Sequence, residues 1–595
     1  MGSLRKVGDI EVLHVKSTPV GIAEKPTSQY NGFSPSKILL PRGHKLTDSN
    51  RSFPVDTIWE RDIAITMRDG VKLYADVFRP SNESLRVPAI MVWSPYGKTG
   101  TGYFSLDNIP CRVGVPKANL SGYEKFEGPD PAEWIQHDYA IVNVDPRGVF
   151  ASEGDICFFG TAEGRDGFDT IEHLAKLRWC NGKVATMGNS WLASAQWFIA
   201  AERPPSLACM LPLEGLSDFY RENFCRGGVP NSTFFGPYMF RRLFGNSKTE
   251  DVASMLKLYP FMNGYWLDKR AKIEEIRTPA YVLASMSTCL HTVGSLRGFE
   301  EIPHEKKWLR LHPTQEWHDL YKPESNADFK KFLDFYTKGI ENDWESTAKA
   351  RISVLRYNEP PLYNLSFSTW PIPETQWRSL RLSSNWKLTE DSPDSGKASY
   401  QADIVGQQDG KDQEELSFTF TFPERCTLIG PARATLYVSC AEHDEMDVFV
   451  QIRKADKDGN VLSNSNIPLH ELGKSSLDEV PEINVLKYLG PTGVLRASHR
   501  AIDPSLTKPH WTAHDHTKEA KITPGEIVKL DIGIWPASIQ WSAGERLVFK
   551  VAGHSMTLAE FPVLQGTYTT ANKGKHTLYF GEEYKSSLQI PVVII

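Results

Sequence analysis

Two apolar stretches meet at residue 190. Residues 184–187 (VATM) form a short apolar run typical of a buried strand, and residues 191–201 (WLASAQWFIAA) form an alanine-rich run long enough for a helix that covers a sheet. Gly188, Asn189 and Ser190 lie between the two runs. The pattern therefore predicts a tight strand-to-helix turn that lifts Ser190 out of the sheet and leaves backbone N–H groups free beside it.

The same alternation of predicted strands and helices continues on both sides of this turn. Apolar runs that indicate strands alternate with stretches whose apolar residues recur at helical spacing. This alternation predicts a mostly parallel sheet that is covered on both faces. The expected elements are a hairpin over 63–78 that turns at Asp69-Gly70, strands at 89–93, 139–144, 279–284 and 307–311, and helices at 164–176 and 329–338.

Two segments depart from this rhythm. Residues 211–275 are rich in aromatic side chains, and we expect a helical insertion that caps the site, with additional core packing as the alternative for any single ring. Beyond residue 350, short alternating strands separated by Pro, Gly, Asn and Asp are typical of a β-sandwich. The aromatic residues of the insertion are Phe219, Tyr220, Phe224, Phe234, Phe235, Tyr238, Phe240, Tyr259, Phe261, Tyr265 and Trp266.

Composition narrows the functional classes. A chain of 595 residues with a formal net charge of -6 and no basic block is too long for one core and gives no indication of nucleic-acid binding. No apolar run is long enough to span a bilayer, and the N-terminus has no apolar leader. The 8 scattered cysteines are typical of reduced thiols in a cytoplasmic protein. We expect a small-molecule substrate, no cofactor and no membrane partner. Assembly into a homo-oligomer stays open.

Several short motifs occur in an order that resembles one family. The chain is similar to the CocE/NonD hydrolases, which include cocaine esterase and the X-Pro dipeptidyl-peptidases. The resemblance spans nearly all of residues 57–590. It rests on residues 68–73 (RDGVKL), 94–98 (SPYGK), 145–148 (DPRG), 152–154 (SEG), 188–190 (GNS), 212–215 (PLEG) with Asp218, 430–434 (GPARA), 447–449 (DVF) and 495–500 (LRASHR).

This resemblance implies an α/β-hydrolase core with an inserted helical cap, followed by a jelly-roll β-sandwich. The expected boundaries are an N-terminal arm at 1–55, a core at 56–210 and 276–350, the cap at 211–275 and the jelly roll at 351–595. The resemblance also implies that Ser190 is the nucleophile, and that the Tyr96 hydroxyl and the Trp191 backbone N–H stabilise the oxyanion. The usual Gly-x-Ser-x-Gly motif has Leu192 in place of its last glycine.

The catalytic acid and base depart from the family pattern. The acid is expected in the loop after the strand at 279–284, but residues 285–294 contain no Asp or Glu, so Thr288 or Cys289 takes its place. The family histidine follows the next strand, where the ungapped register puts Glu316 and a shift of two residues brings in His318. His318 is the first candidate for the base and His291 the second. His312 also lies near this position in the sequence, and a packing role stays open for each histidine.

Two further groups have alternative interpretations. His510, His514 and His516 have a composition seen at metal sites, but no second ligand pair stands near them, and we interpret the segment as a loop without metal. Cys289 could be a nucleophile, although a lone cysteine is commonly an inert, small apolar residue.

Two functions agree with these residues. In the first, the protein is a serine hydrolase that acts on an ester, lactone or amide of a small, largely apolar molecule through an acyl-serine. In the second, the same pocket, which lacks a complete triad, catalyses a lyase, isomerase or cyclisation step, for example in natural-product biosynthesis, or binds a ligand without reaction.

Overall fold

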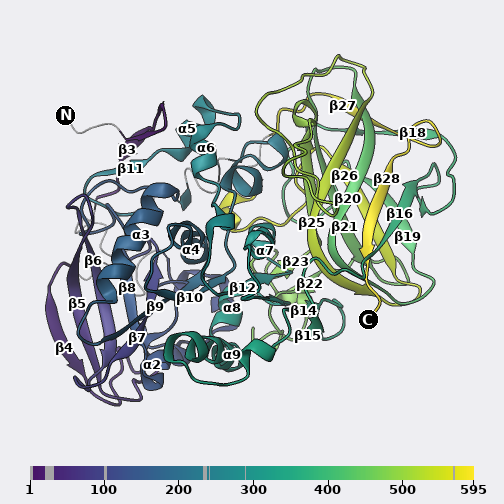
Figure 1. The fold of residues 1–595 in the computed structure, drawn as a ribbon. Helices are drawn as coiled ribbons and strands as arrows, with labels where there is room; N and C mark the ends of the chain where they lie inside the picture. Colours follow the sequence, from purple (N-terminus) through teal and green to yellow (C-terminus); the bar gives the residue numbers. More distant parts are fainter. Residues whose placement is uncertain are drawn as a thin grey trace.

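Two lobes lie side by side in the computed structural model, which describes residues 5–19, 32–98, 104–231, 233, 238–239, 242–288, 290–566 and 570–595 (Figure 1). The first lobe, in purple to green, is an α/β unit, and the second, in green to yellow, consists mainly of strands. Phe234, Phe235, Phe240 and Cys289 lie outside the described residues. No helix within these ranges is long and apolar enough to cross a membrane.

The first lobe is organised around a sheet of 11 strands among the described residues. The strands from β8 through β14 in the sheet order run parallel, and the pairs at either end are antiparallel. The prediction of a mostly parallel sheet is confirmed. In spatial order the strands are β15 (Leu362–Phe367), β14 (Ala350–Val354), β13 (Lys307–His312), β12 (Ala280–Ser285), β10 (Leu207–Leu213), β9 (Cys180–Asn189), β7 (Val87–Trp93), β8 (Ala140–Asp145), β6 (Lys72–Pro80), β5 (Thr57–Thr66) and β4 (Ser36–Leu40).

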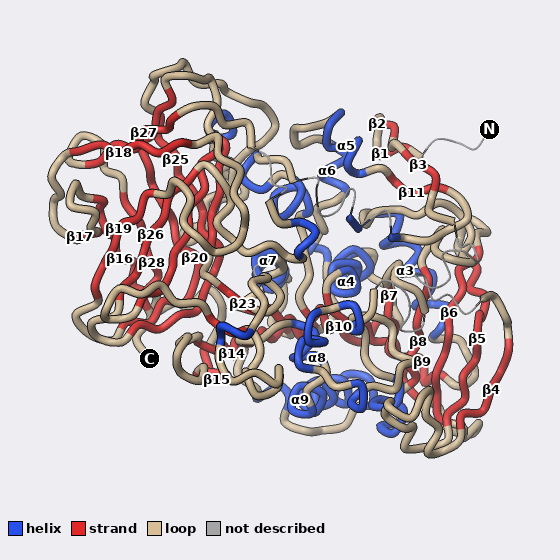
Figure 2. Tube along the Cα trace, turned by 180° about the vertical axis from the view of Figure 1, so that it is seen from behind, coloured by secondary structure: helices blue, strands red, loops and turns tan. Residues whose placement is uncertain are grey.

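Helices pack on this sheet where the apolar periodicity predicts them (Figure 2). Ten of the eleven residues of α4 (Trp191–Ala201) are buried, because this helix is apolar on every side. The last expected helix starts earlier than its periodicity indicates and ends in a π-helical turn, Asp334–Lys338. The other helices of the core are α2 (Pro131–Trp134), α3 (Thr161–Leu174), α7 (Thr292–Glu301), α8 (Glu316–Leu320) and α9 (Pro323–Leu333).

The second lobe is a β-sandwich, as the strand spacing predicts. Its strands pair antiparallel throughout, and β18 extends the sheet by pairing with β27. The spatial order is β17 (Leu388–Thr389), β16 (Gln376–Leu382), β28 (Ser587–Val592), β20 (Cys426–Cys440), β25 (Val528–Trp541), β24 (Thr492–Arg496), β21 (Asp447–Ala455), β26 (Arg546–Ala552) and β19 (Leu416–Thr421), with β18 (Gly396–Gln401) and β27 (Lys575–Phe580) beside β20.

The observed sheets extend past the expected boundaries at two places. Strand β4 lies in the segment expected to be a surface arm, and β15 lies beyond residue 350, yet both belong to the core sheet. Phe53 of the arm is fully buried. These segments join the sheet because an edge strand offers unpaired backbone groups that a further strand can satisfy.

The insertion after β10 contains short elements rather than long helices. They are a π-helical turn (Tyr220–Phe224), β11 (Lys248–Glu250), α5 (Val252–Leu258) and α6 (Gly264–Asp268). The N-terminal strand β3 (His14–Lys16) pairs antiparallel with β11, so the first residues of the chain hold the insertion in place.

Candidate active site

Ser190 lies at a strained turn between the central strand β9 and helix α4. Its backbone has φ 57° and ψ -116°, a combination that a non-glycine residue adopts only under constraint. The constraint comes from both sides, because the Ser190 N–H donates to the Glu214 carbonyl at 2.7 Å and the Ser190 carbonyl accepts from Ser194 at 2.8 Å. The predicted strand-to-helix turn is confirmed.

The missing glycine of the motif has a steric explanation. Gly188 has φ +145°, and a Cβ built on it would lie 2.4 Å from the Leu192 side chain. The absence of a side chain at residue 188 therefore leaves the room that Leu192 occupies, and Leu192 is 1% exposed. A leucine at residue 192 is thus compatible with the turn because Gly188 has no side chain that would occupy the same space.

A cavity of about 310 Å³ opens above Ser190. Its walls come from the core, from the insertion and from the sandwich lobe, and none of the described residues that line it is Lys or Arg. Most of the lining is apolar, which suits a small, largely apolar molecule. The lining residues are Tyr96, Phe104, Asn108, Ile109, Phe126, Glu127, Phe159, Ser190, Trp191, Ser194, Leu216, Phe219, Tyr238, Met239, Leu290, His291, Glu316, Trp317, Val485, Glu560 and Phe561.

Tyr96 and Glu127 line the cavity together with Ser190. The Ser190 side chain acts on the pKa of both groups, and Tyr96 and Glu127 act on each other, so the three side chains are neighbours. The Trp317 indole N–H donates to Glu127 Oε1 at 2.9 Å. Burial raises the pKa of Glu127 to about 8, although Trp317, Ser190 and Tyr96 partly oppose the shift. A carboxyl group therefore occupies the place beside the serine where an imidazole is usual.

Trp191 is held by a second buried carboxyl group. Its indole N–H donates to Glu163 Oε1 at 2.9 Å, and the Trp93 indole N–H donates to the same oxygen at 2.8 Å. The Trp191 backbone N–H is in the first turn of α4, where no intrahelical acceptor exists for it. Tyr96 and Trp191 thus lie on the cavity wall with Ser190, as the oxyanion prediction requires.

Thr288, one of the two residues expected in the place of the family acid, contacts a carboxylate. The Thr288 hydroxyl donates to Glu214 Oε2 at 3.2 Å. Glu214 follows β10, is fully buried, and its Oε1 lies 2.5 Å from His312 Nε2. His312 Nδ1 lies 3.9 Å from Asp319 Oδ1, and Asp319 in turn pairs with Arg310. A buried series of charged groups therefore runs from the turn behind Ser190 into the core.

Glu316, which the ungapped register puts at the position of the family histidine, lies on the cavity wall. It is the first residue of α8 and lines the cavity, and its Oε2 has no hydrogen-bond partner. Burial, together with the neighbouring charge of Glu214, raises the pKa of Glu316 well above its ordinary value.

The two histidines proposed as bases differ in position. His318 does not line the cavity, since its Nε2 lies 2.7 Å from Oε2 of Glu471 in the sandwich lobe. The structure therefore does not bring this first candidate to Ser190. His291 does line the cavity, and burial lowers its pKa to about 3, so its ring is neutral at ordinary pH.

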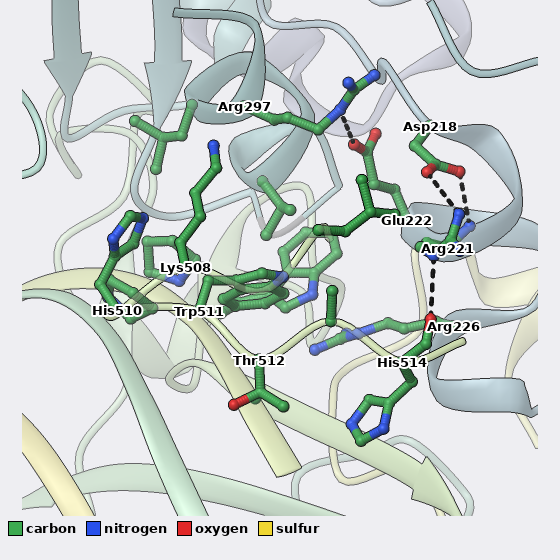
Figure 3. A pocket seen from close by; sticks show the side chains of 18 of the residues that line it. Asp218, Arg221, Glu222, Arg226, Arg297, Lys508, His510, Trp511, Thr512 and His514 are labelled. Atoms are coloured by element: carbon green, nitrogen blue, oxygen red, sulfur yellow. Dashed lines mark hydrogen bonds and ion pairs between the residues drawn. The ribbon is translucent and has the colours of Figure 1, made fainter. Parts of the chain in front are cut away.

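The histidines of the 510–516 loop lie at a second cavity, of about 130 Å³, between the insertion and the sandwich lobe (Figure 3). In the described part of the chain, no group of three His, Cys, Asp or Glu side chains is arranged to hold a metal ion. Carboxylates accompany the cations here, for example Arg221 with Asp218 at 3.2 Å and Lys508 with Glu300 at 2.6 Å.

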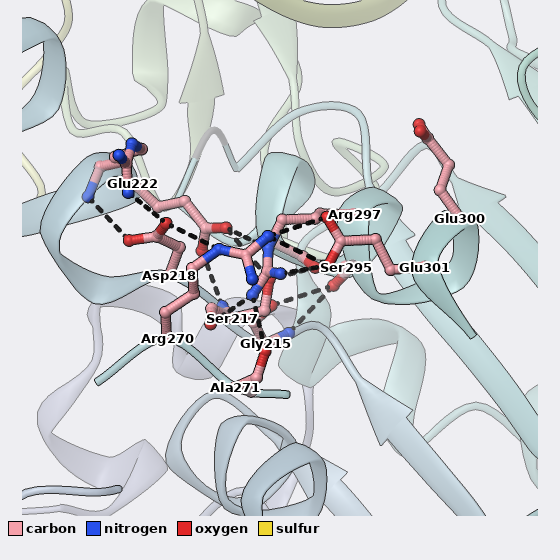
Figure 4. A network of polar contacts seen from close by, with 12 residues as sticks. Gly215, Ser217, Asp218, Glu222, Arg270, Ala271, Ser295, Arg297, Glu300 and Glu301 are labelled. Atoms are coloured by element: carbon pink, nitrogen blue, oxygen red, sulfur yellow. Dashed lines mark hydrogen bonds and ion pairs between the residues drawn. The ribbon is translucent and has the colours of Figure 1, made fainter. Parts of the chain in front are cut away.

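The same kind of pairing continues along the wall of that cavity (Figure 4). Arg297 contacts Glu301 within α7 at 2.5 Å, and it also contacts Glu222 at 3.6 Å and donates to the Ser217 carbonyl at 2.6 Å. The contacts with Glu222 and Ser217 fasten α7 to the insertion. Cations and carboxylates pair with each other here, whereas no Lys or Arg is among the described residues that line the cavity above Ser190.

Glu127 was not among the residues predicted from the sequence. Phe126-Glu127-Gly128 carries no motif, and Glu127 stands among other charged residues, Glu124, Lys125 and Asp130, so no local signal distinguishes it. Glu127 has φ +68°, a conformation that a sequence does not reveal for a non-glycine residue.

Comparisons with known proteins agree with this architecture. Residues 69–257 match the model of the X-Pro dipeptidyl-peptidase (S15 family), and residues 342–589 match that of the X-Pro dipeptidyl-peptidase C-terminal non-catalytic domain. The crystal structure of a CocE/NonD family hydrolase from Staphylococcus aureus superposes with a TM-score of 0.81 at 29% identity, covering 99% of both chains.

Two curated sequences extend the likeness to esterases. A Mycobacterium bovis protein, provisionally named a serine esterase, is 22% identical over 89% of this chain and 94% of its own length. Cocaine esterase from Rhodococcus sp. is 29% identical over 27% of this chain and 24% of its own length. With both family models matched in order, and a solved relative covering the whole fold, the chain is a hydrolase of the CocE/NonD type and belongs with the X-Pro dipeptidyl-peptidase-like enzymes.

Proposed function

We propose that the protein is a serine hydrolase that cleaves an ester, lactone or amide of a small, largely apolar molecule through an acyl-enzyme on Ser190. The observation that carries this proposal is the position of Ser190, at a strained strand-to-helix turn, on the wall of an aromatic cavity that Glu127 and Tyr96 also line. A serine needs a base within hydrogen-bond reach to become nucleophilic, and we assign that role to Glu127.

The mechanism uses a carboxylate where the family uses a histidine. The ionised Glu127 takes the proton of Ser190 as Oγ attacks the carbonyl carbon, and the Tyr96 hydroxyl and the Trp191 N–H donate to the oxyanion. Collapse of the tetrahedral intermediate releases the alcohol or amine, and water then attacks the acyl-serine. A carboxylate is a weak base at its ordinary pKa, so the raised pKa of Glu127, about 8, improves it for this role.

Covalent labelling tests the nucleophile. A fluorophosphonate probe should label the wild-type protein, with the mass added on Ser190, and Ser190→Ala should neither be labelled nor hydrolyse p-nitrophenyl butyrate. Prompt hydrolysis by Ser190→Ala would reject the acyl-serine. Silence of the wild-type protein toward both the probe and simple esters would favour the non-hydrolytic alternative.

The pH profile tests the base. Glu127 must be ionised to act, so kcat/KM for p-nitrophenyl butyrate, whose leaving group needs no proton, should rise about tenfold per pH unit below pH 8 and level off above it. Glu127→Gln should lower kcat/KM by about 10²–10⁴-fold. Glu124→Gln is the matched control, because burial also raises the pKa of Glu124 to about 8, yet this side chain does not line the cavity. A profile that stays unchanged in Glu127→Gln would assign the base to another group.

A further inference from the structure

Two carboxyl groups, and not one, face the reacting centre. Glu127 comes from the loop before α2, and Glu316 comes from the start of α8, yet both line the cavity above Ser190. Each has one oxygen, Oε2, that is buried without a hydrogen-bond partner. A buried polar atom without a partner is costly unless it has a function in the occupied site. The proposed function assigns the role of base to Glu127, and Glu316 has no role in it.

The surroundings of Glu316 keep its carboxyl group neutral. The titratable groups that face it are Glu214 after β10, Glu127, Glu560 of the sandwich lobe, and His291 on the cavity wall. No Lys or Arg lies among the described lining residues to favour ionisation. Like charges brought together in a buried site cannot all ionise, so one carboxyl group retains its proton.

Glu214 and Asp319 contact cationic or polar groups that Glu316 lacks. Glu214 Oε1 is 2.5 Å from His312 Nε2, and its Oε2 accepts from the Thr288 hydroxyl at 3.2 Å. On the far side of His312, Asp319 is ion-paired with Arg310. Although burial acts against ionisation, Arg310 and His312 hold the pKa of Asp319 below its ordinary value. Glu316 has no Lys or Arg beside it among the described lining residues, and its Oε2 has no hydrogen-bond partner, so its carboxyl group retains a proton.

We propose that Glu316 is a second catalytic group, a general acid that delivers its proton to the leaving group while Glu127 acts as the base. The proposal rests on the serine hydrolase function above. In acylation, Glu127 receives the Ser190 proton, the Oγ–C bond forms, the bond to the leaving oxygen or nitrogen breaks, and the Glu316 proton moves to that atom. In deacylation, water gives a proton to Glu316, and Glu127 returns its proton to Ser190. Both carboxyl groups end in their starting states.

In this scheme Glu214 and His312 are positioning residues, since they act on the substrate only through Glu316. For a substrate whose leaving group needs a proton, the wild-type kcat/KM should follow a bell-shaped pH dependence, because the base must be ionised and the acid protonated. The falling limb belongs to Glu316, whose pKa is raised well above its ordinary value.

Two esters with the same acyl group provide the test. In p-nitrophenyl butyrate the leaving group departs without a proton, whereas the ethoxide of ethyl butyrate requires one. Glu316→Gln should lower kcat/KM for ethyl butyrate by about 10²-fold or more and leave that for p-nitrophenyl butyrate within a few-fold. Because kcat/KM reports only steps through acylation, the shared deacylation does not enter. Glu316→Asp, which restores a proton donor, should recover part of the ethyl ester activity.

Glu214→Gln tests the positioning pair separately. It removes a negative charge that acts on Glu316 while keeping the shape, so the falling limb for ethyl butyrate should move to lower pH. A thermal melt at pH 7 checks that each variant is folded. Equal losses on both esters in Glu316→Gln, or a falling limb that stays in place in Glu214→Gln, would overturn the acid role. Failure of the wild-type enzyme on both esters would instead overturn the proposed function.

Discussion

At the scale of single residues, Tyr96 joins the nucleophile to its base. Its hydroxyl interacts with both Ser190 and Glu127, and its ring packs edge-on against Trp191 with the centroids 6.3 Å apart. Burial and the nearby Glu127 raise the pKa of Tyr96 well above its ordinary value, so the phenol keeps its proton. A neutral phenol is the form that can donate to a developing oxyanion.

Removal of that hydroxyl should slow turnover more than binding. Tyr96→Phe should lower kcat by about 10²-fold with little change in KM, because the lost donor acts in the transition state. Steady-state kinetics on p-nitrophenyl butyrate measure both constants. Tyr123→Phe, which removes a hydroxyl bonded to His44 Nε2 at 2.8 Å away from the cavity, is the control. An unchanged kcat in Tyr96→Phe would remove the oxyanion role.

At the scale of elements, the turn between β9 and α4 depends on the absence of a side chain at residue 188. The close packing of Leu192 against Gly188 lets the helix begin directly after Ser190. The strain at Ser190 is therefore supported by packing on both sides, and the hydroxyl is held in one place before substrate arrives.

Gly188→Ala should destabilise the protein by about 1–3 kcal/mol, because the new Cβ meets Leu192 and the backbone has positive φ. Denaturant unfolding measures the free energy. Gly182→Ala isolates the backbone cost, since Gly182 also has positive φ, at +89°, and no atom lies within 4 Å of its added Cβ. If both variants lose the same amount, contact with Leu192 does not contribute. In a Leu192→Ala background the loss for Gly188→Ala should be smaller.

At the scale of the whole molecule, the sandwich lobe is part of the site. It provides Val485, Glu560 and Phe561 to the cavity wall, and Asn484 donates to the Thr288 carbonyl at 2.9 Å. Histidines lie in the contact between this lobe and the insertion. His499 Nδ1 is 2.9 Å from His516 Nδ1, and the Phe261 ring stacks on His499. One of the two facing nitrogens must donate and the other accept, so at least one ring carries a defined neutral tautomer.

This contact should weaken in acid. Burial, followed by the nearby Arg496, lowers the pKa of His499 to about 4, whereas in the unfolded chain it is near 6.5. As the pH falls through this interval the unfolded state binds more protons, so the stability present above pH 6.5 is lost towards pH 4. His499→Gln should reduce the fall in unfolding free energy between pH 7.5 and pH 5 by about 2 kcal/mol. The exposed His470→Gln is the control, and an equal fall in wild type and His499→Gln would contradict the assignment.

The sequence by itself determined the elements and their order. The turn at Ser190, the parallel core and the sandwich follow from apolar periodicity and turn residues, which act over a few residues and are therefore visible in one chain. The register that put Glu316 in the place of the family histidine is also readable from the sequence alone. The edge strands β4 and β15 could not be predicted from the sequence, because pairing at a sheet edge depends on which backbone groups the other strands leave unpaired.

Only the tertiary structure decided which side chain faces Ser190. The segments of Glu127 and Glu316 are joined by the contact of Trp317 with Glu127, which spans 190 positions of the chain. His318, two positions from Glu316, turns instead toward Glu471. One residue step on a short helix redirects a side chain by about 100°, so spacing in the sequence cannot choose between neighbours. The shifted pKa of Glu127 likewise arises only after burial removes water from the carboxyl group.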